Sequence, residues 1–156
     1  MSAIDDLLDP IPLPRVVKVK QRFDRPKVED PEAELTRLMK EKGISNLIRK
    51  GMSIAVTVGS RGISNQPLMV KTLIRELKAA GAEPFIIPAM GSHGGATAAG
   101  QKAMLEGMGF TEAAMGAPIR ATMDTVVIGT SSTGIPVNID RYAAEADGIV
   151  DRKSVV

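Results

Sequence analysis

Residues 51–62 read GMSIAVTVGSRG, and this stretch decides the fold class. Within it, Ser53–Val58 is short, apolar and rich in β-branched residues, and a glycine lies on either side. This pattern is typical of a strand buried on both faces of a parallel sheet. The periodicity of the following residues predicts a helix over 66–80, with Ser64 or Asn65 as its N-cap.

The same order of elements repeats directly downstream. Residues 84–88, PFIIP, predict a second buried strand, and residues 97–107 predict a second helix. Ala103, Met104 and Met108 are expected to face the core. Strands that alternate with helices over short connections indicate right-handed βαβ units. We therefore predict an α/β fold with a Rossmann-like, parallel or mixed sheet flanked by helices.

Before this core, three segments have different patterns. Residues 1–14 hold three prolines and predict an extended arm. Residues 15–23, RVVKVKQRF, alternate apolar and basic side chains, which predicts a half-buried edge strand. A third helix is predicted to start at Asp30 and Pro31, a capping residue followed by a proline in the first turn, and to end near Gly43.

The downstream part of the chain predicts a hairpin and a strand. Residues 125–128 and 135–139 are two short apolar segments around a turn-rich GTSSTG sequence. Asp140 is expected to cap a helix that reaches residue 146. Gly148–Val150 begins another apolar strand, but a polar DRKS sequence follows at once. Because three residues are short for a central strand, we expect a truncated N-terminal domain.

These elements predict one α/β domain over residues 1–156 in four parts. Residues 1–50 hold the arm, the edge strand and a helix, and residues 51–110 hold the βαβα core. Residues 111–150 hold the hairpin, a helix and the start of the last strand, and residues 151–156 form a tail.

Composition excludes several classes of function. The chain has no cysteine and one histidine, His93, which excludes disulfides, thiolate metal sites and sites built from several histidines. A formal net charge of +2 and 3% aromatic residues argue against a nucleic-acid partner. No apolar run approaches the length of a membrane span, and the N-terminus does not resemble a signal peptide. We expect a cytoplasmic protein that binds no membrane.

Two glycine-rich loops carry the candidate site. Each follows a predicted parallel strand and opens a helix, so both are expected at the carboxyl edge of the sheet, where ligands bind in such folds. Glycines permit a close approach of the backbone, and free N–H groups at a helix start suit a phosphate or carboxylate. An arginine can hold an oxyanion, and histidine titrates near neutral pH. The candidate catalytic residues are His93 and Arg61, and the candidate cofactor-binding residues are Gly59, Ser60, Arg61, Gly62, Gly91, Ser92, Gly94 and Gly95.

Each of these features also has a simple structural explanation. Glycine loops are often only turns, a lone histidine is often incidental, and Ser60 and Ser92 can serve as helix caps. Neither of the common dinucleotide or phosphate-loop glycine fingerprints is present. The functional interpretation is favoured because Arg61 and the sole histidine lie in equivalent loops of adjacent βαβ units.

Four stretches resemble the nickel-dependent lactate racemase family and its relatives. They are residues 56–63 (VTVGSRGI), 88–97 (PAMGSHGGAT), 129–139 (GTSSTGIPVNI) and 140–150 (DRYAAEADGIV). With the helices between them they cover most of residues 50–150. The occurrence of PAMGSHGGAT (residues 88–97) after VTVGSRGI (residues 56–63) is a fairly specific combination.

The resemblance implies a two-domain α/β protein with an active site between its domains. In the lactate racemases, a nickel-pincer nucleotide tethered to a lysine accepts a hydride from a 2-hydroxy acid, and two histidines exchange the hydroxyl proton. His93 matches the first of those histidines. Arg61 matches an arginine of the loop that faces cofactor and substrate. The implied ligands are a small 2-hydroxy acid or a phosphate-bearing molecule.

The chain departs from the family pattern in two ways. The lactate racemases carry an aspartate at the position of Val58. The second histidine, the tethering lysine and the nickel-binding histidine all lie beyond the match to Val150. The resemblance therefore implies the N-terminal portion of a racemase or epimerase, inactive as this chain, with no cofactor bound and no metal ligand assigned.

Two alternatives to an enzyme domain stay open. One is a phosphate- or nucleotide-binding α/β module without catalysis. The other is an inert structural fragment whose uncovered sheet edge pairs with another copy, giving a homo-oligomer.

Overall fold

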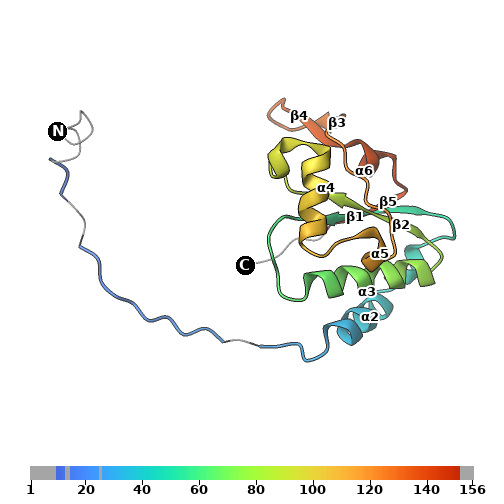
Figure 1. The fold of residues 1–156 in the computed structure, drawn as a ribbon, viewed down its shortest axis with the longest axis horizontal. Helices are drawn as coiled ribbons and strands as arrows, with labels where there is room; N and C mark the ends of the chain where they lie inside the picture. The colour runs from blue at the N-terminus through green and yellow to red at the C-terminus, as the bar shows by residue number, and fades with distance from the viewer. Residues whose placement is uncertain (1–9, 13–14, 25, 152–156) are drawn as a thin grey trace.

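The computed structural model describes residues 10–12, 15–24 and 26–151, and it has the predicted α/β architecture (Figure 1). Three parallel strands form the main sheet in the order β2 (Glu83–Pro88), β1 (Ser53–Val58) and β5 (Gly148–Val150). The register pairs Val58 with Pro88 across the first ladder. Strand β1 is central, and its apolar residues are buried, as its sequence predicts.

Helices cover both faces of this sheet. The crossover from β1 to β2 contains α3 (Gln66–Ala79), whose apolar side packs with α4 (Ala98–Gly107) on one face. Alternate β1 residues belong to this larger core cluster. The opposite face is covered by a smaller cluster around α6 (Arg141–Glu145). Burial on both faces explains why β1 and β2 are almost continuously apolar.

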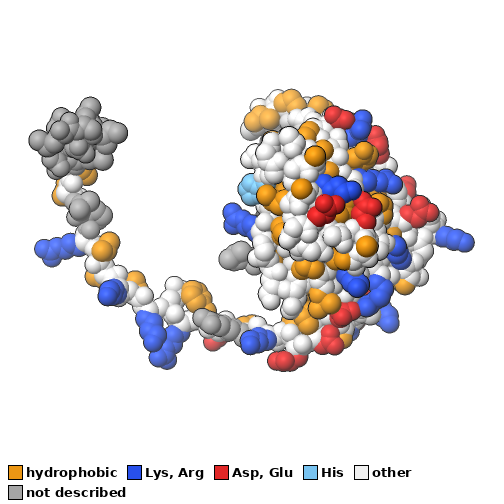
Figure 2. Space-filling model, viewed as in Figure 1, with side chains coloured by type: hydrophobic (Ala, Val, Ile, Leu, Met, Phe, Trp, Pro, Cys, Tyr) orange, Lys and Arg blue, Asp and Glu red, His pale blue; other side chains and the backbone are white. Residues whose placement is uncertain are grey.

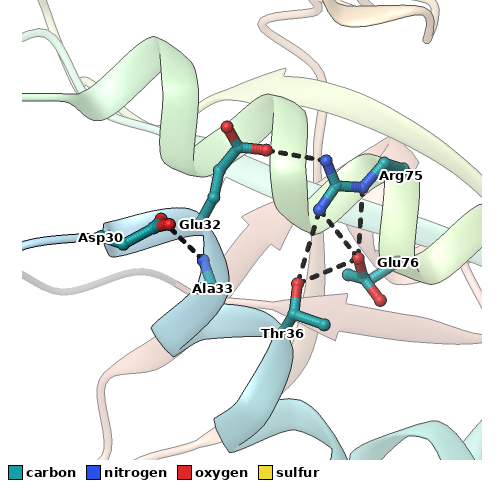
Figure 3. Close-up of polar contacts among 6 residues, drawn as sticks. All are labelled: Asp30, Glu32, Ala33, Thr36, Arg75 and Glu76. Carbon is teal, nitrogen blue, oxygen red and sulfur yellow. Dashed lines mark hydrogen bonds and ion pairs between the residues drawn. The ribbon is translucent and has the colours of Figure 1, made fainter.

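Helix α2 (Pro31–Glu41) begins as predicted and is fastened to α3. The Asp30 carboxylate accepts a hydrogen bond from the Ala33 amide, 3.0 Å away, and so caps the helix. Arg75 of α3 donates to Glu32 at 2.7 Å and to Glu76 at 3.0 Å, as Figure 3 shows. A short 3-10 turn, η1 (Ile44–Leu47), follows α2.

The downstream hairpin is confirmed. Strands β3 (Thr125–Thr130) and β4 (Pro136–Asp140) pair antiparallel as a separate two-stranded sheet. A one-turn helix, α5 (Glu112–Met115), precedes it. Asp140 then caps α6 by accepting from the Ala143 amide at 3.1 Å, which was also predicted.

The predicted edge strand over residues 15–23 is wrong. These residues belong to no strand, and they leave the body of the molecule as an extended segment (Figure 1). Val17 and Val19 are 81% and 88% exposed. The alternation of apolar and basic side chains specifies which residues could share a face, but a strand also needs a neighbour whose backbone accepts its hydrogen bonds.

Two finer predictions need correction. Ala103 is exposed and Leu105 occupies the core position instead, while Met104 and Met108 are partly buried against the core. Asn65 is the N-cap of α3, but its side chain makes no capping hydrogen bond, because its backbone is left-handed. Most of the predicted arm and tail, residues 1–9, 13–14 and 152–156, lies outside the described residues.

Candidate functional site

The parallel pairing of β1 and β2 brings the two glycine loops to one edge of the sheet. The ladder continues past Val58 because the Ala89 amide donates to the Val58 carbonyl at 2.8 Å. Residues 59–62 and 91–95 therefore begin side by side at the carboxyl ends of their strands. This is the edge at which open α/β sheets bind ligands.

A side-chain hydrogen bond joins the two loops. Nδ1 of His93 lies within hydrogen-bonding distance of Oγ of Ser60, and either atom can be the donor. Ser60 is half-buried, and His93, whose glycine neighbours carry no side chains that could enclose it, is exposed. Figure 2 shows the histidine, the only one in the chain, at the surface of the body.

Backbone contacts fix the loop that carries His93. Gly91, Gly94 and Gly95 all have positive φ, and so does Ala96 at +52°. The buried side chain of Gln101 donates to the Gly91 carbonyl at 2.8 Å. A turn is closed by the Ala96 amide, which donates to the Ser92 carbonyl at 3.1 Å. The glycines therefore serve this left-handed backbone, which other residues rarely adopt.

Arg61 lines a cavity of about 800 Å³. Its polar lining includes Gly59, Ser60, Arg61 and the carboxylate residue Asp151. Its apolar walls come from α2, α3 and the end of β5, with Leu35, Met39, Met69, Leu73, Leu77 and Val150 among the lining residues. Arg61 itself is exposed. The cavity lining therefore combines apolar helix side chains with one cationic and one acidic residue.

These residues fit one part of the implied cofactor and not the other. Left-handed glycines, an arginine and hydroxyl groups are typical of sites for phosphate or carboxylate. Imidazole is the side chain here that suits nickel, and the chain has one histidine, already assigned to proton exchange, and no cysteine. Within residues 10–12, 15–24 and 26–151, no group of three or more histidine or acidic side chains could hold a metal ion. The described residues therefore do not fit a nickel ion.

Sequence reasoning missed two parts of this site. Gln101 was not singled out, because a polar residue in the first turns of a helix is usually solvated, whereas this one is buried and holds the loop. The cavity between α2 and α3 was also missed, since it depends on how two helices distant in sequence pack. For Gln101, the available signal was a glutamine shortly after a glycine-rich loop.

The fold and the paired loops define a class: an α/β domain with a candidate anion site at the carboxyl edge of its parallel sheet. The chain belongs to the lactate racemase N-terminal domain family, whose profile matches residues 10–155. No curated protein matches the chain. In the part of the chain that the structure describes, no helix is long and apolar enough to cross a membrane.

Proposed function

We propose that this chain is the proton-exchanging and anion-holding part of a 2-hydroxy-acid racemase or epimerase that acts by hydride transfer. The observation that carries the proposal is the contact between Ser60 and His93, which joins two loops of a lactate racemase-like domain. The resemblance implies a nickel-pincer nucleotide as the hydride acceptor. No residue of this chain matches the lysine that tethers that cofactor in the family or the histidine that binds its nickel. A small 2-hydroxy acid is the proposed substrate, and the cytoplasm the proposed location.

The residues divide the work by their chemistry. When a 2-hydroxy acid is oxidised to its ketone, the hydroxyl proton must leave as the α-hydrogen departs with its electron pair. An imidazole suits this proton transfer near neutral pH, so we assign it to His93. The guanidinium of Arg61 is assigned to the substrate carboxylate or a cofactor phosphate, which it can hold through two hydrogen bonds.

A second candidate function is a phosphate- or nucleotide-binding module without catalysis. It is favoured by the left-handed backbone at Gly91, Gly94 and Gly95, because such turns direct successive N–H groups toward an anion. Both functions use the same loops, and the ligand that binds distinguishes them.

Ligand titration followed by NMR of the single imidazole tests the proposal. We expect D- and L-lactate and malate to shift the His93 resonances, and the shift to be lost in Arg61→Gln. Arg15→Gln, in the exposed segment before α2, is the matched control and should titrate like the wild type. Shifts with inorganic phosphate but with no 2-hydroxy acid would favour the binding module. No shift with either ligand would favour an inert fragment.

A further inference from the structure

The cavity of about 800 Å³ shares residues with the candidate site. Ser60 lines it, and the hydroxyl of Ser60 contacts Nδ1 of His93. Arg61, the residue assigned to an anion, lines it as well. A ligand whose hydroxyl is held at His93 therefore has the rest of its carbon chain within reach of this cavity, which has the volume of a small-molecule site.

The apolar walls of the cavity extend well beyond the loops. Its lining residues on α3 begin at Gln66 and end at Leu77, and so span roughly 16 Å along the helix at a rise of about 1.5 Å per residue. Helix α2 packs beside α3 and supplies the facing wall (Figure 1). One methionine on each helix can adapt to the shape of an apolar ligand. The apolar lining residues of the two helices include Leu35, Met39, Met69, Leu73 and Leu77.

Two charged residues belong to the lining, and they act differently on a ligand. Asp151 accepts a hydrogen bond from the Thr57 hydroxyl at 3.2 Å, and its negative charge repels an anion. The guanidinium of Arg61 attracts one. The other lining residues in the described part of the chain are uncharged. The walls of α2 and α3 therefore suit an apolar group, because a second carboxylate there would lose its hydration without a second cation to pair with.

We infer that this cavity takes the apolar side chain of the substrate, and that the substrate is a 2-hydroxy acid with an alkyl chain of several carbons. The inference rests on the proposed function, which assigns the carboxylate to Arg61 and the hydroxyl proton to His93. The methyl group of lactate fills little of a cavity of about 800 Å³. Each further methylene that enters the cavity leaves water and strengthens binding about three- to fourfold.

The test is the dependence of affinity on chain length, measured from the NMR signals of His93 in the whole chain. The ligands are 2-hydroxybutyrate, 2-hydroxyhexanoate and 2-hydroxyoctanoate, at the same pH and ionic strength. We expect the dissociation constant to fall about tenfold at each step of two methylenes. A dissociation constant that stays the same along the series would overturn the inference.

A pair of methionine variants tests whether the alkyl chain binds in this cavity. Met69→Gln puts a polar group of similar length in the wall, and it should reduce the gain at each step to about threefold or less. Met104→Gln, on α4, is the matched control and should keep the tenfold steps, because Met104 is partly buried like Met69 but lies outside the lining. Equal steps in Met69→Gln and in the wild type would mean that the chain binds elsewhere, and the inference would be wrong.

Three carboxylates without the 2-hydroxyl distinguish this inference from the proposed function: butyrate, hexanoate and octanoate. We expect the 2-hydroxyl to tighten binding at every chain length. If both series bind more tightly with length but the hydroxyl adds nothing, the apolar site stands and the proposed function fails. If the 2-hydroxy acids bind more tightly than the plain carboxylates but show no dependence on length, the proposed function stands and the inference fails. His93 signals that stay unchanged with every ligand would overturn both.

Discussion

Thr72 is a buried polar residue with no evident structural use. Thr72 belongs to α3 and is 1% exposed. Its hydroxyl has no hydrogen-bond partner in the described part of the chain. A buried hydroxyl without a partner costs roughly 1–3 kcal/mol. We expect Thr72→Val, which keeps the shape, to raise the free energy of unfolding by about 1 kcal/mol in urea denaturation. Thr130→Val, at an exposed position, should change it by less than about 0.5 kcal/mol.

The close contact of Gly94 with Gly100 is a second feature of single residues. A Cβ on Gly100 would lie 1.9 Å from the Gly94 carbonyl oxygen, so the loop that carries His93 would have to move. We expect Gly100→Ala to lower the free energy of unfolding by about 1–3 kcal/mol, and to shift the His93 NMR signals. Gly107→Ala, in the same helix but with open space around it, is the control and should be neutral or stabilising. A Gly100→Ala variant with wild-type stability would contradict the contact.

At the scale of residues, the sequence predicted that the two loops share an edge of the sheet, but not which of their side chains are in contact. Arg61 and His93 follow strands whose order could be predicted, so their common edge followed from topology. The contact between Ser60 and His93 depends on loop backbone angles that no periodicity encodes. The left-handed conformation of Ala96 was equally unpredictable, because alanine seldom adopts it.

Among the elements, β5 is joined to β1 by the charged side chain that precedes it, Asp147. Asp147 accepts hydrogen bonds from the backbone amide of Ser53 at 2.8 Å and from its hydroxyl at 3.0 Å, which tie the start of β5 to β1. These bonds lower the pKa of Asp147 below its usual value of 3.8, the amide having the larger effect. A carboxyl whose pKa is lowered by folding stabilises the folded state above its unfolded pKa, and this contribution is lost as the pH falls through the folded value.

Replacing that carboxyl should therefore flatten the acid dependence of stability. We expect the loss of stability between about pH 6 and about pH 3 to be smaller in Asp147→Asn than in the wild type, measured by urea unfolding at both pH values. Part of the loss should remain, because folding also lowers the pKa of Glu34 and Glu112. Asp24→Asn, in the exposed segment, should behave like the wild type. An unchanged acid dependence in Asp147→Asn would show that these bonds do not hold β5.

The elements also show where sequence patterns stop being informative. β1 and β2 were predictable because burial on both faces leaves a continuous apolar run. The segment 15–23 has an equally clear alternation, yet it forms no strand, since pairing depends on a neighbour that the pattern does not contain. The hairpin of β3 and β4 was predictable because its partner strands are adjacent in the chain.

For the molecule as a whole, the hairpin exposes an apolar surface. Val127, Ile128, Ile135 and Val137 are all exposed there, and apolar surfaces on open strands tend to pair. Self-association stays a prediction, and light scattering at high concentration should detect it. We expect Ile128→Lys to weaken it, whereas Ser132→Lys in the same hairpin should not. A wild-type protein that remains monomeric would contradict the prediction.

The final prediction concerns what this chain can do alone. Imidazole and thiolate groups are common side-chain ligands of nickel, and His93 is the one such side chain among the 156 residues. Racemisation by return of a hydride to either face of the ketone also needs an acid or base on each side to exchange the hydroxyl proton. We therefore expect the purified chain to bind no stoichiometric nickel in metal analysis. Given the pincer nucleotide and nickel, it should leave the optical rotation of lactate, malate and related 2-hydroxy acids constant. Turnover that disappears in His93→Ala would show that this domain suffices for catalysis, and that the proton returns through a group other than a second histidine.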